Sequence, residues 1–161
     1  MGGLVAYPTS TLPGLGCLPT KKGLDTLFDV KKRSADQPVS LGVASIKQAS
    51  KLVEVPQFAM SLLENFPLGS ITLILDAIDT LDERLGGERV AVRVFANPVA
   101  KALAEGVGPI TATSANPSGI EPSNNVSLAA QSLNLKQISV LDGDCPGGRG
   151  STILSVEKNS T

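Results

Sequence analysis

Small hydroxyl side chains gather in one loop near the start of the sequence. Thr9, Ser10 and Thr11 follow an apolar run, and Gly14 and Gly16 come soon after them. Hydroxyls donate and accept hydrogen bonds, and glycine lets a backbone approach a ligand closely. The segment therefore suits a loop that binds a polar molecule, although an ordinary turn of Gly and Pro accounts for the same residues.

Two cations lie close together in the segment KKRSADQP. Lys31 and Arg33 are two residues apart, near the expected end of a helix. Such a pair can grip phosphate groups, because arginine offers a bidentate fork and lysine a point charge. The alternative is a solvated helix end, where cations interact favourably with the helix dipole. This segment alone leaves both interpretations open.

A third cation stands inside an expected strand. In VAVRV, strict alternation puts Arg93 on the same face as Ala91 and opposite the neighbouring valines. A charge among β-branched residues needs a partner if it is buried. Arg93 is therefore either exposed at the surface or placed to capture a carboxylate or a phosphate.

Residues 108–119, GPITATSANPSG, form an apolar run that breaks into hydroxyl and amide groups, with Ser114 and Asn116 among them. A later segment, DGDCPGGRGSTI, carries glycines that lead to Ser151 at an expected strand start. Glycine-rich loops with exposed N–H groups form anion-binding nests. Neither segment is a Walker A or dinucleotide-binding sequence. Each of these segments is weak evidence alone, but their occurrence together on one small domain is harder to dismiss as a set of ordinary turns.

The composition limits what this site can do. The 161 residues include no His, which excludes Ser-His-Asp and Cys-His catalysis and the common His-containing zinc sites. No metal-ligating residues are expected. A net charge of −1 and an aromatic content of 3% argue against nucleic-acid binding through a global charge excess or base stacking.

Cellular context follows from the cysteines and the apolar runs. Cys17 and Cys145 fit no metal spacing and are expected to be structural thiols in a reducing cytoplasm. No apolar run approaches the roughly 18 residues of a membrane span, and no signal peptide precedes the first expected strand. We expect a soluble, cytoplasmic protein without a membrane partner.

The elements that position these residues are expected to form one α/β domain. Strands are predicted over 3–7, 39–45, 70–77, 89–94, 109–113, 137–142 and 151–156. Helices are predicted over 21–33, 46–53, 57–65, 97–108 and 125–134, and loops over 8–20 and 79–88. Asn97 is expected to cap its helix, with Pro98 in the first turn. Because strands and helices intermix without strict alternation, we predict a twisted, mixed, open sheet with flanking helices.

Taken in order, these segments resemble the YrdC/TsaC family of threonylcarbamoyl-AMP synthases. The resemblance is carried by VAYPTST with GLGC, KKR with a later Pro, FPLGSITLIL, VAVRV with NP, TSANPSG and STIL, and it covers nearly the whole chain. The sequence departs from the family pattern at Ser10, Pro13, Ser34, Gln37, Gly42 and Phe95. Gly42 stands where the family commonly has a His near the threonine. Residues 1–161 would form a single YrdC-like domain, short at both termini.

The resemblance implies a concave cavity and an ATP-dependent synthesis. Family members join L-threonine, bicarbonate and ATP into threonylcarbamoyl-adenylate and pyrophosphate, with Mg²⁺ accompanying the nucleotide. A downstream threonylcarbamoyl-transferase complex then modifies adenosine 37 of ANN-decoding tRNAs, and tRNA itself is a further partner that the resemblance suggests.

Matching positions imply roles for eight residues of this chain. Lys31 and Arg33 would be the catalytic pair and hold the ATP phosphates. Asn116 and Asn124 would contact the nucleotide. Thr11, Arg93, Ser114 and Ser151 would contact threonine.

Two other functions remain open on the sequence. One is a YrdC-like module that binds nucleotide or RNA without synthesis. The other is the YrdC-like part of a carbamoyl-transfer system, which uses the same carbamoyl-adenylate chemistry on another substrate. The short chain and the lack of companion domains count against the second.

Overall fold

The computed structural model of the chain describes residues 3–117, 119–133 and 138–157. The strands are β1 (Leu4–Tyr7), β2 (Gly14–Gly16), β3 (Ser40–Val43), β4 (Ile71–Asp76), β5 (Arg89–Val94), β6 (Ile110–Ser114), β7 (Ile138–Val140) and β8 (Thr152–Ser155). The helices are α1 (Lys21–Lys31), α2 (Ile46–Ala49), α3 (Gln57–Asn65), α4 (Pro98–Val107) and α5 (Val126–Ser132), with a short 3-10 helix, η1 (Glu83–Leu85).

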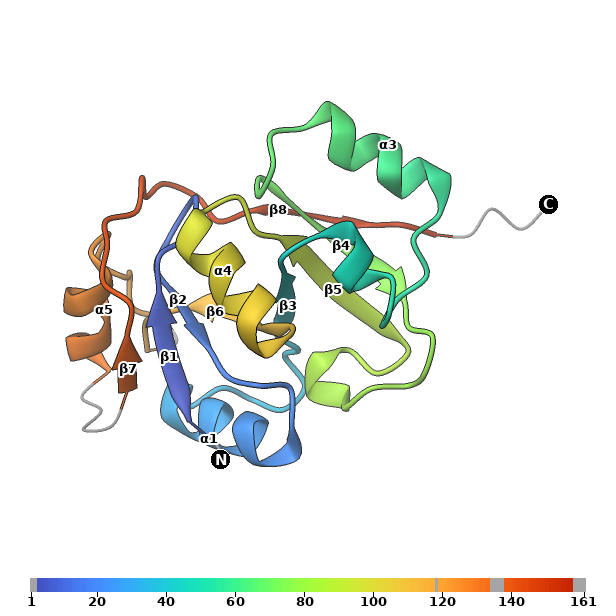
Figure 1. Ribbon diagram of the computed structural model, residues 1–161. Helices are drawn as coiled ribbons and strands as arrows, with labels where there is room; N and C mark the ends of the chain where they lie inside the picture. The colour runs from blue at the N-terminus through green and yellow to red at the C-terminus, as the bar shows by residue number, and fades with distance from the viewer. Residues whose placement is uncertain (1–2, 118, 134–137, 158–161) are drawn as a thin grey trace.

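The strands form one open, mixed sheet in the order β7-β1-β2-β6-β3-β5-β4-β8. The pairs β1–β7, β3–β5 and β4–β8 are parallel, and the other neighbours are antiparallel. Figure 1 shows α4 across the middle of this sheet, with α5 beside β7 at one end and α3 toward β8 at the other. The predicted mixed open sheet with flanking helices is confirmed.

Three predicted elements differ from the structure. The expected loop 8–20 contains β2, because Gly14 and Gly16 let this strand pass close under the Tyr7 ring. A Cβ atom at position 14 would lie 2.6 Å from Tyr7 Cζ. The expected helix 46–53 ends at Ala49, after which the chain turns and Val53 forms a bridge with Ala77. The expected connector 79–88 contains η1.

The other predicted boundaries lie within a few residues of the observed ones. Helix α1 ends at Lys31 because Lys32 takes a left-handed conformation, with φ of 50°. Asn97 caps α4 through its side chain and Pro98 begins the helix, as predicted. The ends of the predicted helix 125–134 and strand 137–142, at Asn134 and Gln137, lie outside the described residues.

Apolar side chains pack on both faces of the sheet. One large cluster joins the inner sides of α1 and α3 to alternate residues of β3, β4 and β5, including Leu27, Leu41 and Leu73. A smaller cluster joins α4 to Tyr7 and Phe95 on the opposite face. Within the described residues, no helix combines the length and apolar character needed to cross a membrane.

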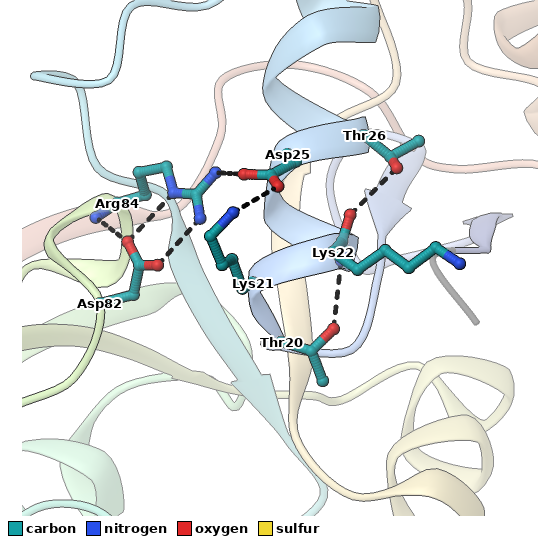
Figure 2. Close-up of polar contacts among 8 residues, drawn as sticks. Thr20, Lys21, Lys22, Asp25, Thr26, Asp82 and Arg84 are labelled. Carbon is teal, nitrogen blue, oxygen red and sulfur yellow. Dashed lines mark hydrogen bonds and ion pairs between the residues drawn. The ribbon is translucent and has the colours of Figure 1, made fainter.

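An ionic cluster fixes α1 against η1, as Figure 2 shows. The Arg84 guanidinium pairs with Asp82 at 2.9 Å and with Asp25 of α1 at 2.6 Å, and it lies over the Phe28 ring. The Arg84 carbonyl also accepts a hydrogen bond from Val39 N at 2.8 Å. This contact holds the segment between α1 and β3, which carries Arg33.

Candidate functional site

A cavity of about 260 Å³ opens on the sheet face that carries α4. Paired residues of neighbouring strands contribute to its lining, since Ser40 pairs with Ala112 and Gly14 pairs with Ser114. Its lining residues are Tyr7, Thr9, Thr11, Leu12, Pro13, Gly14, Arg33, Pro38, Val39, Ser40, Thr72, Arg93, Ala112, Thr113, Ser114, Gly150, Ser151 and Ile153. Hydroxyl groups and two arginines therefore supply its polar surface.

Arg93 is buried in the wall of this cavity, with 8% of its surface exposed. Its Nε donates to the Gly69 carbonyl at 2.9 Å, and its Nη2 donates to Ser10 Oγ at 3.1 Å and to Thr11 Oγ1 at 3.0 Å. These three acceptors are neutral, so they orient the guanidinium without cancelling its charge. Burial lowers the pKa of Arg93 from its ordinary value, but arginine remains protonated at neutral pH. Of the two interpretations of Arg93, surface exposure is therefore wrong.

Lys31 lies at the end of α1 with 2% of its surface exposed. Its Nζ donates to the Ser114 carbonyl at 2.6 Å and to Thr113 Oγ1 at 3.1 Å, and it lies 3.5 Å from Asn116 Oδ1. Burial, which has the larger effect, and the nearby charge of Arg33 lower the pKa of Lys31 to about 8. The solvated-helix-end interpretation is wrong for Lys31, because its ammonium group joins α1 to the end of β6.

Arg33 is half-buried and lines the same cavity. Its Nε donates to the Gln37 carbonyl at 2.7 Å and its Nη2 to the Pro38 carbonyl at 2.9 Å. Both acceptors are again neutral backbone oxygens. Partial burial lowers the pKa of Arg33.

The segment at the end of β6 forms both a turn and part of the cavity wall. Ser114 lines the cavity and donates its hydroxyl to Asn116 Oδ1, while Asn116 Nδ2 donates to the Ile120 carbonyl. Asn116 thus closes the turn behind the wall and is not among the described residues that line the cavity. Ser118 lies outside the described residues.

The late glycine-rich loop closes the cavity from the other side. Gly147 N donates to the Thr11 carbonyl at 2.8 Å, which ties this loop to the first hydroxyl loop. Gly150 and Ser151 line the cavity. Asn124 is exposed beside Gly147 and, like Asn116, does not belong to the described lining.

Thr11, Arg33, Arg93, Ser114 and Ser151 therefore line one cavity, and Lys31 contacts its wall. Sequence reasoning missed Thr72, a fully buried hydroxyl on β4 that also lines the cavity. Its signal was a single hydroxyl within the apolar run ITLIL.

Gly42 lies directly beside Arg93 in the pairing of β3 with β5. A Cβ atom at this position would collide with the Phe95 ring, which is buried and packs edge-on against Tyr7 at 5.6 Å between ring centroids. Phe95 thus fills the space that a side chain at position 42 would need.

Replacing Gly42 with Ala is expected to destabilise the protein by about 1–3 kcal/mol, because overpacking a close-packed core forces strain. Urea unfolding would show a lower midpoint with an unchanged slope. Gly106→Ala is the matched control, since nothing lies within 4 Å of a Cβ atom at that position in α4, and we expect it to hold or raise stability. Equal midpoints for Gly42→Ala and the unsubstituted protein would contradict the packing account.

The geometry suits an anionic ligand held without covalent catalysis. Two arginines line the cavity, and the described lining includes no Asp, Glu or His. A separate, larger cavity of about 640 Å³, which includes Phe58 of α3 and Leu75 of β4 in its lining, contains none of the predicted site residues.

Comparisons with known proteins agree on one family. A family model named Sua5/YciO/YrdC, described as "Telomere recombination", matches residues 1–161. Threonylcarbamoyl-AMP synthase of Aliivibrio fischeri is 33% identical over 150 residues, which cover 89% of this chain and 81% of that protein. The Bacillus subtilis protein of the same name is 35% identical over 159 residues, covering 94% of this chain and 46% of that protein.

A solved structure extends the likeness to three dimensions. The crystal structure of P. abyssi Sua5 complexed with L-threonine matches with a TM-score of 0.88 at 33% identity, covering 99% of this chain and 48% of that one. The chain thus spans about half the length of the B. subtilis and P. abyssi proteins.

Proposed function

The chain belongs to the Sua5/YciO/YrdC family, and from that premise we propose that it is an L-threonylcarbamoyladenylate synthase. The proposed substrates are L-threonine, bicarbonate and ATP. The products are threonylcarbamoyl-AMP, pyrophosphate and water. Relatives carrying the synthase name at 33% and 35% identity support this proposal.

The proposed chemistry needs no protein nucleophile. The deprotonated amine of threonine adds to bicarbonate and releases water, which leaves a carbamate. A carbamate oxygen then attacks the α-phosphorus of ATP, and the bond from that phosphorus to the bridging oxygen breaks as pyrophosphate leaves. The protein contributes alignment and neutralisation of charge, which suits a site without His.

Arg93 is the observation that carries the proposal. Its guanidinium is buried at the cavity with three neutral acceptors, and a buried charge is stable when an opposite charge joins it. We assign the threonine carboxylate to this position. Thr11, Ser114 and Ser151 would complete the amino-acid end.

The nucleotide end would use the remaining cations. Lys31 and Arg33 would hold the phosphates, and they qualify as catalytic residues if they contact the reacting α-phosphate. Asn116 and Asn124 would then contact the nucleotide from outside the cavity lining. Because the described lining has no carboxylate, Mg²⁺ would be carried mainly by phosphate oxygens of the nucleotide, as is common for this ion.

The wider role would be tRNA modification. A threonylcarbamoyl-transferase complex would consume the adenylate and modify adenosine 37, with tRNA as a further partner. We place the reaction in the cytoplasm, where the free, buried thiols of Cys17 and Cys145 would remain reduced.

Pyrophosphate release tests this proposal directly. With ATP, Mg²⁺ and bicarbonate, release is expected only after L-threonine is added, and a coupled phosphate assay with a no-threonine control would measure it. ATP binding without release would instead support the nucleotide-binding module. Release that requires carbamoyl phosphate in place of threonine and bicarbonate would support the carbamoyl-transfer function.

A further inference from the structure

Thr72 is a buried hydroxyl in a strand that is otherwise apolar. The residue is 1% exposed, and its neighbours Ile71 and Leu73 belong to the hydrophobic core. Burying a hydroxyl without a hydrogen bond is unfavourable. A threonine at this position therefore calls for a polar partner.

The partner is Ser151, whose Oγ lies 2.5 Å from Thr72 Oγ1. The parallel pairing of β4 with β8 sets this distance, because Thr72 pairs with Ile153 and Thr152 N donates to the Ser70 carbonyl at 2.9 Å. Ser151 is half-buried and Thr72 fully buried, so Ser151 is the member that reaches the open cavity.

Arg93 continues the same row across the sheet. Leu73 pairs with Val92 in the antiparallel register of β4 and β5, which puts Thr72 opposite Arg93. Arg93, Thr72 and Ser151 therefore follow one another on the cavity face, and all three line the cavity.

The two hydroxyls have two hydrogens, and their mutual bond uses one of them. If Thr72 donates to Ser151, the remaining hydrogen belongs to Ser151 and points to the cavity. If Ser151 donated instead, the remaining hydrogen would lie on the buried Thr72. The first arrangement leaves the free donor where a ligand can accept it.

We propose that Thr72 is a positioning residue that holds the Ser151 hydroxyl as a hydrogen-bond donor beside Arg93, toward an oxygen of the amino-acid substrate. This inference rests on the proposed function and adds a residue to its amino-acid end. An oxygen acceptor next to a guanidinium suits a carboxylate, because both groups donate to it.

Thr72→Val tests the inference, because valine keeps the shape of threonine and removes its hydroxyl. We expect about a tenfold rise in the KM for L-threonine, the equivalent of one lost hydrogen bond. The KM for ATP should change less than twofold. Thr72→Ser, which keeps the hydroxyl, should stay within about threefold of the unsubstituted protein for L-threonine. Thermal melting would verify that each variant is folded.

Ser151→Ala provides the decisive comparison. Because Thr72 acts through Ser151, the double variant Thr72→Val/Ser151→Ala should match Ser151→Ala alone. Additive effects, equal rises in both KM values, or an unchanged KM for L-threonine in Thr72→Val would overturn the inference.

Calorimetric titration with L-threonine keeps the two proposals separable. If the unsubstituted protein binds L-threonine but releases no pyrophosphate, the proposed synthesis fails. The inference about Thr72 is then still supported if Thr72→Val binds L-threonine about tenfold more weakly than the unsubstituted protein. If L-threonine does not bind, or binds both proteins equally, the inference fails.

Discussion

Replacing Arg93 with Met is expected to lower the kcat/KM for L-threonine by at least about a hundredfold, which corresponds to roughly 2.7 kcal/mol. The loss is large because the guanidinium is buried, and hydrogen bonds to charged groups are worth about 1.5–3 kcal/mol each. Methionine preserves much of the side-chain length but offers no donor. Initial rates of pyrophosphate release at varied L-threonine would measure the effect, with the ATP dependence recorded in parallel.

Arg89 on the same strand provides the matched control. Its guanidinium pairs with Asp76 at 2.6 Å and is absent from the described lining of the cavity. Arg89→Met should reduce stability and leave the KM for L-threonine unchanged. A similar fall in the kcat/KM for L-threonine in both variants would indicate a general structural effect and would contradict the proposed role of Arg93.

Replacing Lys31 with Met is expected to weaken ATP binding by ten- to a hundredfold at pH 7, which corresponds to about 1.4–2.7 kcal/mol. Lys31 is charged at this pH, because burial and the charge of Arg33 lower its pKa only to about 8. Its neighbour Lys32 is exposed, so Lys32→Met removes the same charge as a control. Comparable losses of ATP affinity in both variants would indicate that Lys31 acts only through general electrostatic attraction.

The pH dependence gives Lys31 a second signature. As pH rises through 8, Lys31 loses its proton, so ATP affinity should fall in the unsubstituted protein and stay flat in Lys31→Met. Stability should change in the opposite direction. The folded pKa of about 8 lies below the ordinary 10.5, so between these values the unfolded chain binds more protons. The contribution of Lys31 to the free energy of unfolding should therefore increase as pH rises from about 8 to 10.5. Urea unfolding at several pH values would measure it.

The regular elements followed from local patterns in the sequence. The alternation of RVAVRV gave β5 its observed bounds, and the Asn97–Pro98 start of α4 was correct because capping is a local interaction. Strand β2 was missed because three residues with two glycines look like a turn, and only the Tyr7 ring above them explains the glycines.

The grouping of the site residues could not be predicted from local sequence patterns. Arg93 and Thr11 are separated by 82 residues, and no local pattern predicts their contact. The order of motifs in the resembled family supplied that grouping. The same reasoning could not find the Thr72–Ser151 pair, since it depends on the register of two parallel strands that are far apart in sequence.

The packing of Phe95 over Gly42 also restricts the order in which this sequence can diverge. A descendant that gains a side chain at position 42 before losing the ring at position 95 must pass through a collided core. A descendant that first replaces Phe95 with a smaller residue loses packing against Tyr7, but it remains free to accept a larger residue at position 42. Either single step costs stability, so substitutions at positions 42 and 95 are expected to be correlated among descendants.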